Sequence, residues 1–333
     1  MTLRINVLFT SVGRRVELLR AFKRAYADLG LNGNIVAVDI DPLAPALQEA
    51  DRPYIVPRLS EPSYIPTLAE ICRREQVHLI FPLIDPDILL LARHRQELES
   101  VGARVIVVSE EAAITTADKW LTYQFFRKLG VPTPYSWLPE QINSAALVYP
   151  VFIKPRFGSA GKQAFPVRNE RELLFFLDYV PDPIVQEYLP GPEITNDVIC
   201  DFEGNVLAVV SRQRIEVRWG EVAKGKTIYD PKIIQHCVTI ARGLKSIGPI
   251  TVQCILRDGK PYFTEINARF GGGVPLGIAA GVRSPHWFLA LAAGLPVEVP
   301  PLGSYKVGIY LTRFDDSFFL TEEDYARIAS RHL

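Results

Sequence analysis

The first part of the chain alternates short apolar segments with segments of helical periodicity. The apolar segments, which we expect to be strands, are 4–9, 34–40, 77–83 and 103–109. The segments that we expect to be helices are 16–28, 63–75 and 86–100. Strands separated by helices pair in parallel, because each helix returns the chain to the same end of the sheet. The sequence therefore predicts an α/β fold that begins with a doubly wound parallel sheet, and we assign an N-terminal α/β domain to residues 1–112.

Beyond residue 112 the pattern changes to strands that follow one another with few helices between them. In residues 113–190 we expect helices at 116–130 and 169–180 and strands at 149–155 and 183–189. In residues 191–333 we expect a helix at 231–246 and strands at 194–202, 205–213, 250–256 and 261–268. These two parts are predicted to be a small lobe and a C-terminal lobe of one α+β module with antiparallel sheets.

The composition is that of a globular protein without a strong electrostatic field. Hydrophobic residues make up 48% and charged residues 22%, and Lys+Arg and Asp+Glu both number 37. This balance argues against a nucleic-acid or membrane partner. We interpret the N-terminus as a strand and not a signal peptide, and no segment has the ~20 apolar residues of a membrane span. Four scattered cysteines without a Cys-x-x-Cys pair argue against structural zinc and favour a cytoplasmic location.

The segment "TEINARFGGG" (264–273) carries the strongest chemical signal. Glu265, Asn267 and Arg269 alternate with apolar residues, so that they share one face of a strand. Carboxylate and amide oxygens suit Mg²⁺, and an arginine beyond them can stabilise a developing negative charge. A solvated strand face with an ion pair explains the alternation equally well. The flexible glycine run that follows favours the site.

The hairpin before this strand decides whether Gln253 joins the same face. Asp258-Gly259 normally signals a two-residue type I′ turn, which would pair Val252 with Glu265 and turn Gln253 away. A three-residue loop at 257–259, or another bulge of the same parity, would place Gln253 on the face of Glu265. We expect the second arrangement, because the metal site requires it.

Two further segments combine glycine turns with charged residues. In "FIKPRFGSAGK" (152–162), Lys154 ends an apolar strand and a run of small residues follows, whose backbone N–H groups can approach phosphate oxygens. A glycine hairpin beside a surface lysine is the alternative. In "VQEYLPGPE" (185–193), a strand edge can bind an adenine ring and a carboxylate can hold ribose hydroxyls. An ordinary strand followed by a Pro-Gly turn fits that segment as well.

Together with "ADK" (117–119) and the hairpin 252–273, these segments resemble the ATP-grasp superfamily. The order and spacing are similar to the ATP-binding halves of the carbamoyl phosphate synthetase large subunit and to amino-acid ligases of the pyrrolysine-synthesis type. The resemblance covers roughly residues 110–280. It implies that the antiparallel module is a two-lobed ATP-grasp module, with ATP and Mg²⁺ between residues 116–190 and 191–280.

The resemblance also implies a role for each matching residue. Phosphate contacts would come from Lys119 and Lys154 and from the loop of Gly158, Ser159, Ala160 and Gly161. Adenine would be read by Gln186 and by the backbone of Glu187 and Leu189, and ribose would be held by Glu193. Gln253, Glu265 and Asn267 would bind Mg²⁺, and Arg269 would face the acyl phosphate, with Lys154 as the second catalytic residue. Many relatives have an acid in place of Gln253, so the number of Mg²⁺ ions, one or two, stays open.

The activity that follows is that of an ATP-dependent ligase. It would activate a carboxylate, from an amino acid or a small acid, as an acyl phosphate and join it to an amine. An ATP-grasp small-molecule kinase and a nucleotide-binding regulator without turnover are the alternatives, and the intact set of charged site residues argues against the regulator. The expected partners are the small-molecule carboxylate and amine substrates, and a homodimer is possible. The helical segments 283–293 and 318–331 either pack at such a dimer interface or pack on their own domain.

Three further segments carry charged residues that could bind a ligand. The basic segment 211–227, with a loop-like centre, is either a mobile element near the carboxylate substrate or a solvated hairpin. Arg14 and Arg15 follow the first strand, where they suit an anion or simply end a tight turn. Asp85 and Asp87 follow the third predicted strand, where an open α/β sheet places its ligand groups. They are candidates for binding an amine, and an Asp-Pro turn with a helix cap is the alternative.

Overall fold

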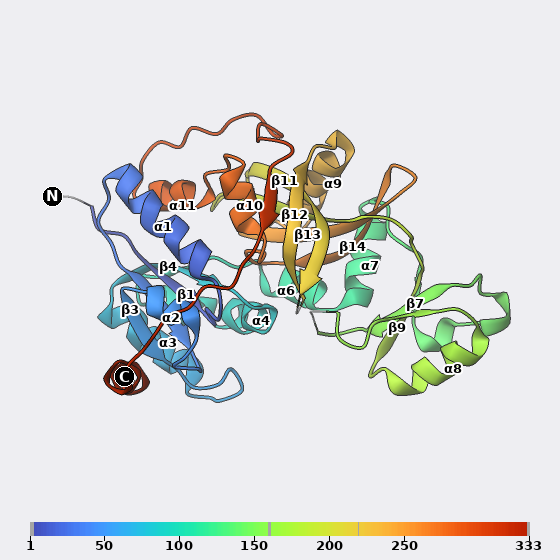
Figure 1. Ribbon diagram of the computed structural model, residues 1–333, viewed down its shortest axis with the longest axis horizontal. Helices are drawn as coiled ribbons and strands as arrows, with labels where there is room; N and C mark the ends of the chain where they lie inside the picture. Colours follow the sequence, from blue (N-terminus) through green and yellow to red (C-terminus); the bar gives the residue numbers. More distant parts are fainter. Residues whose placement is uncertain (1–2, 159–160, 219, 332–333) are drawn as a thin grey trace.

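The computed structural model describes residues 3–158, 161–218 and 220–331, and it contains three sheets. Figure 1 shows a parallel sheet in blue on one side, a large antiparallel sheet in the centre, and a small lobe with β7, β9 and α8 on the other side. The expected succession of a parallel α/β unit and an antiparallel module is confirmed.

The N-terminal sheet has the strand order β3-β2-β1-β4-β5, and all its pairs are parallel. Its strands are β1 (Asn6–Thr10), β2 (Ile35–Asp39), β3 (Arg52–Ile55), β4 (Val77–Pro82) and β5 (Arg104–Val105). Its helices are α1 (Val16–Leu29), α2 (Pro45–Glu49), α3 (Tyr64–Arg74), α4 (Asp85–Arg93) and α5 (Arg95–Glu99). The order reverses direction between β1 and β4, which is the point where open α/β sheets bind ligands at their carboxyl ends.

Several local predictions for this domain were wrong. The helix expected at 86–100 is two helices, because the backbone of His94 leaves the helical conformation between α4 and α5. The strand expected at 103–109 pairs over only two residues. The short α2 and β3 were not predicted, because a four-residue strand that contains Pro53 lacks the apolar run of a central strand.

The large sheet has the order β14-β13-β10-β11-β12-β15 with antiparallel pairs throughout. Its strands are β10 (Glu193–Cys200), β11 (Val206–Arg218), β12 (Glu221–Ile228), β13 (Gly248–Arg257), β14 (Lys260–Asn267) and β15 (Tyr310–Thr312). The helices outside the N-terminal sheet and the small lobe are α6 (Glu110–Ala117), α7 (Lys119–Lys128), α9 (Pro231–Gly243), α10 (Val274–Ala279), α11 (Ser284–Ala292) and α12 (Glu322–Ala329).

The small lobe contains a four-stranded antiparallel sheet in the order β6-β9-β7-β8. Its elements are β6 (Ser136–Trp137), two short 3-10 turns (Pro139–Gln141 and Ser144–Ala146), β7 (Val151–Pro155), β8 (Phe165–Val167), α8 (Glu170–Tyr179) and β9 (Pro183–Glu187). The helix expected at 116–130 is divided into α6 and α7 at Asp118.

The apolar cores explain how these parts hold together. One core joins Leu8 and Leu68 of the N-terminal domain to Val198 of the large sheet and Ile240 of α9. The small lobe has a core of its own, formed by residues of β7, β8, α8 and β9. The N-terminal domain and the large sheet therefore form one packed body, from which the small lobe extends (Figure 1).

Of the two interpretations of segment 211–227, the structure supports the hairpin, and the expectation of a loop-like centre was wrong. β11 and β12 pair along most of this segment, with Trp219 outside the described residues. Arg212, one of the basic residues of this segment, is buried and forms an ion pair with Asp197 through two hydrogen bonds of 2.6 and 2.7 Å. This arginine therefore belongs to the structure of the sheet and offers no free charge to a substrate.

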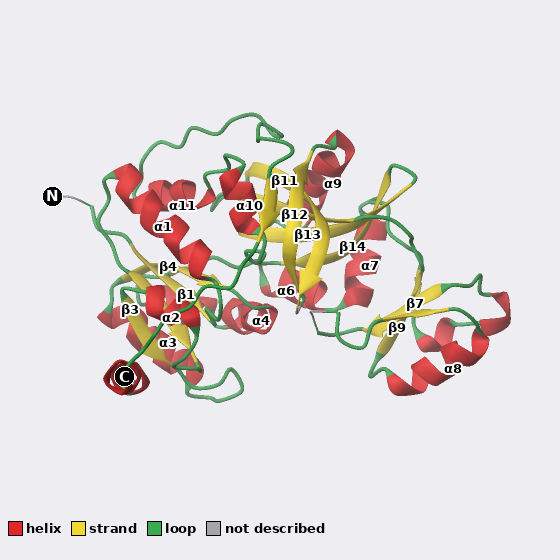
Figure 2. Ribbon diagram, viewed as in Figure 1, coloured by secondary structure: helices red, strands yellow, loops and turns green. Residues whose placement is uncertain are grey.

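The C-terminal part of the chain crosses back over the N-terminal domain. Figure 1, in which the C-terminal part is orange to red, shows a long loop after α11, and Figure 2 shows the helix at the C-terminus, α12, beside the parallel sheet. The backbone N–H of Ile55 in β3 donates to the carbonyl oxygen of Arg331 at 3.0 Å. α11 packs on α1, so the two segments considered for a dimer interface both lie against their own chain.

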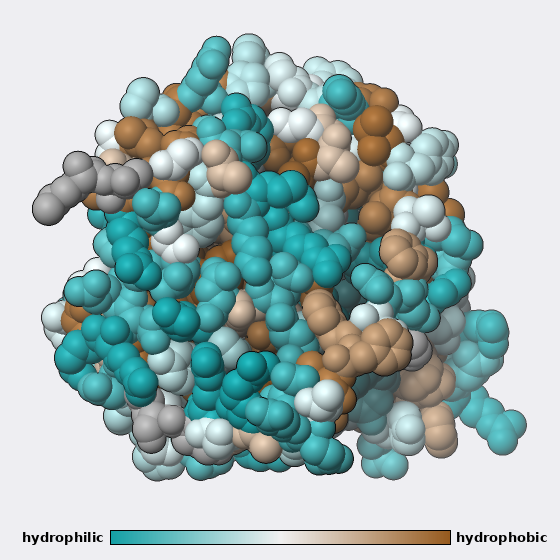
Figure 3. All heavy atoms as spheres, turned by 60° about the vertical axis from the view of Figure 1, so that its left-hand side comes forward, coloured by the Kyte–Doolittle hydropathy of each residue, from teal (hydrophilic) through white to brown (hydrophobic). Residues whose placement is uncertain are grey.

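The surface carries mixed side chains. On the face shown in Figure 3, hydrophilic side chains predominate and apolar ones lie between them in small groups. Among the described helices, none is both long enough and apolar enough to cross a bilayer.

Candidate functional site

The β13–β14 hairpin carries the candidate metal ligands, and its turn differs from our expectation. Arg257 pairs with Lys260, so the turn contains only Asp258 and Gly259, whose φ angles are 51° and 70°. Two consecutive left-handed residues are typical of a type I′ turn, whose twist matches that of the strands. The three-residue loop that we predicted is therefore wrong.

A bulge further along the hairpin restores the parity that the site requires. Gln253 pairs with Glu265, whereas the next residue, Cys254, pairs with Phe263, which leaves Thr264 as the extra residue. Gln253 and Glu265 are thus direct neighbours across the two strands and point to one face. The alternative that we allowed, a bulge of the same parity, is confirmed.

The three predicted metal ligands therefore come together on one side of the hairpin. Asn267 follows Glu265 by two residues and pairs with Thr251, which precedes Gln253 by two. Oxygen atoms from one carboxylate and two amides suit Mg²⁺, which keeps several of its waters when it binds to proteins. No group of three His, Cys, Asp or Glu side chains suited to a metal occurs in the described residues, so Glu265 would supply the negative charge.

Lys154 connects this face to the small lobe. It lies at the end of β7, and its side chain is only 9% exposed. Burial lowers the pKa of Lys154 to about 8, although Glu265 and Glu193 act in the opposite direction and Lys119 acts in the same direction as burial. Four predicted site residues are therefore close enough to interact electrostatically. They are Lys154 of β7, Glu193 of β10, Glu265 of β14 and Lys119 of α7.

Lys119 is positioned by a residue that we did not single out, Asp118. Its carboxylate caps α7 by accepting from the backbone N–H groups of Trp120 and Leu121, and it binds Arg156 through two hydrogen bonds of 2.8 and 2.6 Å. The Lys119 Nζ donates to the carbonyl oxygen of Gly158 at 2.6 Å. An aspartate directly before a helical pattern is an N-cap signal, which could have identified Asp118 from the sequence.

We expect Asp118→Ala to lower the free energy of unfolding by about 2–3 kcal/mol, because it removes both the cap of α7 and the charged hydrogen bonds to Arg156. Asp118→Asn keeps the capping oxygen and should lose about 1 kcal/mol less. Urea unfolding of both variants measures the difference. If the asparagine variant lost as much stability as the alanine variant, the capping role would be excluded.

The lowered pKa of Lys154 predicts a pH dependence of nucleotide binding. Below pH 8 the amine is protonated and can contact phosphate, so affinity for MgATP should fall as the pH rises through about 8. The same shift means that protonated Lys154 destabilises the fold, and that stability rises with pH between about 8 and 10.5. Calorimetric titration at several pH values should show the fall in affinity, and Lys154→Met should bind weakly at all of them. If the affinity of Lys154→Met for MgATP fell with rising pH as steeply as that of the unchanged protein, the assignment of Lys154 to phosphate binding would be contradicted.

The residues expected to bind adenine and ribose lie at the junction of β9 and β10. The Gln186 amide is buried and donates to the Ser136 hydroxyl at 2.9 Å, so its nitrogen is already engaged within the small lobe. The backbone N–H of Glu187 donates to the Tyr135 carbonyl, and its carboxylate pairs with Arg257. An adenine role for Glu187 therefore rests on its carbonyl oxygen.

Leu189 and Glu193 complete this region. Leu189 is buried, and Glu193 pairs with Arg214 of β11 at 3.0 Å. The glycine turn after β7 has Gly158 and Gly161 at positive φ, whereas Ser159 and Ala160 lie outside the described residues. The structure thus brings the described nucleotide candidates to the edge between the two lobes.

Arg269 is held against the N-terminal domain. Its guanidinium pairs with Asp85, the first residue of α4, at 2.8 Å and donates to the carbonyl oxygen of Phe270 at 3.1 Å. The ring of Phe270 packs on Phe81 of β4 with a centroid distance of 5.5 Å. This packing turns Arg269 toward the carboxyl end of the parallel sheet.

The glycine run after Arg269 lies close to charged and polar side chains. A Cβ atom on Gly272 would lie 2.4 Å from the Arg15 guanidinium, and one on Gly273 would lie 2.0 Å from that of Arg212. A Cβ on Gly271 would meet the Thr251 hydroxyl at 2.8 Å. A side chain at any of these three positions would therefore displace a neighbouring polar or charged group.

A second group of charges beside Arg269 was only partly predicted. Glu221, at the start of β12, pairs with Arg15 at 2.6 Å and with Arg313 at 3.1 Å. Burial raises the pKa of Glu221, but Arg15, Arg313 and Arg14 together outweigh it and hold that pKa below its ordinary value. Arg15 was a candidate from its position after the first strand, whereas no sequence signal connected Arg313, which lies far along the chain, to this place.

Asp87 does not join Asp85 in this group. Its carboxylate is fully buried, accepts from the Thr10 hydroxyl at 2.6 Å, and accepts from the Tyr64 hydroxyl at 3.3 Å. Burial raises the pKa of Asp87 to about 6. The contacts show a structural residue that fastens α4 to β1 and α3, so Asp87 is not available to bind an amine.

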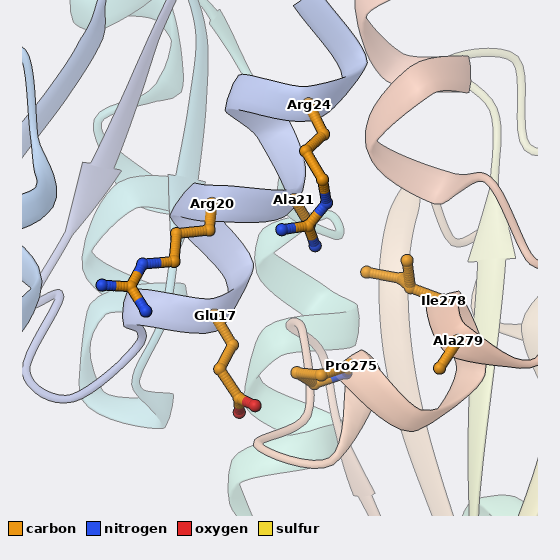
Figure 4. Close-up of a pocket in the computed structure, with 7 residues that line it drawn as sticks. All are labelled: Glu17, Arg20, Ala21, Arg24, Pro275, Ile278 and Ala279. Carbon is orange, nitrogen blue, oxygen red and sulfur yellow. The ribbon is translucent and has the colours of Figure 1, made fainter. Parts of the chain in front are cut away.

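A surface cavity of about 510 Å³ lies away from the nucleotide candidates. Figure 4 shows its walls, which come from α1 and α10 and include Arg20, Arg24 and Ile278. Glu17, which also lines it, pairs with Arg313 at 3.2 Å, so the cavity borders the second group of charges. None of the predicted site residues lines this cavity.

Solved structures with the same fold include several ligases and carboxylases. The biotin carboxylase domain of Hydrogenobacter thermophilus 2-oxoglutarate carboxylase, in complex with MgADP, ADP and bicarbonate, has a TM-score of 0.72 and 19% identity, covering 91% of this chain and 73% of that one. An ADP complex of N5-carboxyaminoimidazole ribonucleotide synthetase has a TM-score of 0.69 and 20% identity, covering 89% and 79%. The L-amino acid ligase of Bacillus licheniformis has a TM-score of 0.67 and 18% identity, covering 86% and 74%.

Family models match the two parts of the chain in the same order. Residues 7–106 match the PylC-like N-terminal domain, and residues 116–273 match the ATP-grasp domain. The second match contains the lysines, the glycine turn and the hairpin described above. The chain therefore contains an ATP-grasp domain that follows a PylC-like N-terminal domain.

Proposed function

We propose that the protein is an ATP-dependent carboxylate–amine ligase, whose carboxylate substrate is an amino acid or another small acid. The observation that carries this proposal is the convergence of Lys154, Glu193 and Glu265 from strands of two different sheets. A buried ammonium beside oxygen ligands for a divalent cation suits the polyphosphate chain of a nucleotide. The ATP-grasp domain supports the same interpretation.

Each part of ATP has candidate residues. Lys119 and Lys154 would contact the α- and β-phosphates, and the turn that includes Gly158 and Gly161 would close over the β- and γ-phosphates. The backbone of Glu187 and Leu189 would bind adenine, and Glu193 would leave Arg214 to hold ribose. Glu265, Asn267 and Gln253 would hold one or two Mg²⁺ ions, which neutralise phosphate charge when bound.

The proposed reaction has two steps. A carboxylate oxygen of the substrate forms a bond to the γ-phosphorus of ATP, and ADP leaves. The nitrogen of the amine then attacks the acyl carbon, phosphate leaves, and the nitrogen loses a proton. Arg269 would stabilise the negative charge of the transferring group, and no covalent protein nucleophile is required.

A screen for phosphate release tests this proposal. Purified protein is incubated with MgATP and with amino acids, small carboxylates and amines, both singly and in pairs, and ADP and free phosphate are measured. We expect equal amounts of ADP and phosphate only when a carboxylate and an amine are present together. ADP without free phosphate would indicate a kinase, and no consumption of ATP in any mixture would indicate a regulator without turnover.

A further inference from the structure

One ion pair connects the small lobe to the end of the large sheet, and it lies beside the region expected to bind adenine. Glu187 is the last residue of β9, and Arg257 is the last residue of β13. The Arg257 guanidinium donates a hydrogen bond to the Glu187 carboxylate. The small lobe has an apolar core of its own, so polar contacts of this kind hold its last strand against the large sheet.

A tyrosine of the next strand fixes the side chain of Arg257. The guanidinium lies over the ring of Tyr262 in β14, 4.6 Å from the ring centroid, and donates to the Tyr262 hydroxyl at 3.1 Å. An arginine fixed by a ring face and a hydrogen bond loses less side-chain freedom on pairing with a carboxylate than a solvated arginine does. Arg257 is therefore a preorganised partner for Glu187.

Residues 188–192 link β9 to β10, and the far end of this linker is fixed to β13 through the backbone. The backbone N–H of Leu256 donates to the carbonyl oxygen of Pro192 at 3.0 Å. Gly191 has a φ angle of 148°, and a Cβ atom there would lie 2.0 Å from the Leu256 carbonyl oxygen, an approach that only glycine allows. The near end of the linker meets β13 through the ion pair.

The near end of the linker offers backbone groups to a ligand. Leu189 is buried, yet its backbone N–H makes no hydrogen bond among the described residues. Buried backbone N–H groups are almost always paired, so this one suits an acceptor atom of a ligand. Adenine presents such an acceptor, N1, beside an amino group that can donate to a carbonyl oxygen such as that of Glu187. Guanine presents the opposite pattern, because its N1 carries a hydrogen and the neighbouring group is a carbonyl.

We propose that Arg257 is a positioning residue that gives the nucleotide site its preference for adenine over guanine. By binding the Glu187 carboxylate it fixes the near end of the linker, so that the Glu187 carbonyl oxygen and the Leu189 N–H keep the spacing and direction that adenine requires. Without Arg257 the linker is fixed at its far end only, and its backbone adapts to either purine. This inference rests on the nucleotide binding of the proposed function and is independent of the ligase chemistry.

Binding measurements on the full chain test the proposal. The unchanged protein and Arg257→Ala are titrated by calorimetry with the β,γ-imido analogues of ATP and GTP in the presence of Mg²⁺. We expect Arg257→Ala to bind the ATP analogue about 10-fold more weakly, because roughly one well-positioned hydrogen bond to adenine is lost. Its affinity for the GTP analogue should change less than about 2-fold, since guanine does not use the fixed backbone.

Variants of the partners show whether Arg257 acts through Glu187. Glu187→Gln should lose the same preference, and the double variant should lose no more than either single variant, because the two side chains act as one unit. Tyr262→Phe keeps the ring face but removes the hydroxyl, so an intermediate loss is expected. Arg93→Ala is the matched control, since Arg93 pairs with Glu110 at 2.9 Å between α4 and α6, and it should change neither affinity.

Two further measurements separate positioning from a general loss of structure. The side chains of Arg257 and Glu187 are 30% and 38% exposed, so their ion pair contributes little to stability. The midpoints of urea unfolding of the variants should therefore stay close to that of the unchanged protein. In the ligase assay, the KM for ATP of Arg257→Ala should rise about 10-fold while kcat changes less than about 2-fold.

The outcomes separate this inference from the proposed function. The expected loss of adenine preference in a protein that never consumes ATP would support the role of Arg257 and contradict the ligase. Ligase turnover with an unchanged purine preference in Arg257→Ala would support the ligase and overturn the role of Arg257. An equal loss of affinity for both analogues, a larger loss in the double variant, or an unchanged protein without adenine preference would also overturn it. Binding of neither analogue by the unchanged protein would overturn both.

Discussion

Glu265→Gln is expected to lower kcat by about 10³-fold or more, because a metal that neutralises phosphate charge contributes several kcal/mol to transition-state stabilisation. Glu265 is the one carboxylate among the three candidate ligands on the β13–β14 hairpin. Glutamine has nearly the same shape, so the hairpin register and the stability of the large sheet should not change. Steady-state kinetics at several Mg²⁺ concentrations measure the loss.

A complementary variant gives this experiment its control. Gln253→Glu places a second carboxylate directly opposite Glu265 and should lower the Mg²⁺ concentration needed for half-maximal activity, since Mg²⁺ prefers charged oxygen ligands. Normal activity of Glu265→Gln at ordinary Mg²⁺ concentrations would contradict the metal assignment for the whole hairpin face.

Arg269→Lys is expected to lower kcat by about 10²-fold while the affinity for MgATP changes little. Lysine keeps the positive charge but loses the planar group that binds Asp85 and the Phe270 carbonyl at the same time. Losing one preorganised donor to a developing negative charge typically has this effect. Single-turnover measurements of ADP formation separate the chemical step from nucleotide binding.

The exposed Arg283 on the other side of α10 offers a matched comparison, and Arg283→Lys should leave kcat unchanged. Equal rates for the Arg269 and Arg283 variants would exclude a catalytic role for Arg269. A loss of nucleotide affinity without a loss of kcat would indicate that Arg269 binds the nucleotide and does not stabilise the transferring phosphate.

The sequence could predict the order of sheets because apolar alternation records which faces of a strand or helix are buried. The parallel N-terminal sheet and the strands that bear Lys154 and Glu265 were correct for this reason. Short elements were missed, because β3 and the break at His94 contain too few residues for a periodic signal. The prediction of a loop-like centre in segment 211–227 was wrong because the polar side chains of a paired strand resemble those of a loop.

The structure of the β13–β14 hairpin could be predicted only by combining local turn preferences with the requirements of the metal site. The turn follows the local preference of Asp258-Gly259, yet the register depends on a bulge at Thr264 that no residue type announced. Only the demand that Gln253 and Glu265 share one face indicated that a bulge must exist. Asp118 shows the reverse case, because an ordinary capping rule could have identified it.

Contacts of the N-terminal domain with the large sheet and with the C-terminal segment could not be predicted from the sequence. Asp85 and Arg269 are 184 residues apart, and Arg313 reaches Glu17 across 296 residues. A single sequence carries no signal for such pairs, because either partner alone looks like a solvated surface charge. These ion pairs become visible only when the packing of the N-terminal domain on the large sheet is known.

The central claim, activation of a carboxylate by ATP, can be measured by following oxygen atoms. The carboxylate substrate found in the screen is labelled with ¹⁸O in both carboxylate oxygens and incubated with MgATP and the amine. If an acyl phosphate forms, one ¹⁸O atom stays on phosphorus when the amine displaces phosphate, and mass spectrometry will find one ¹⁸O in each released phosphate. Unlabelled phosphate, or phosphorylated substrate without released phosphate, would contradict the ligase.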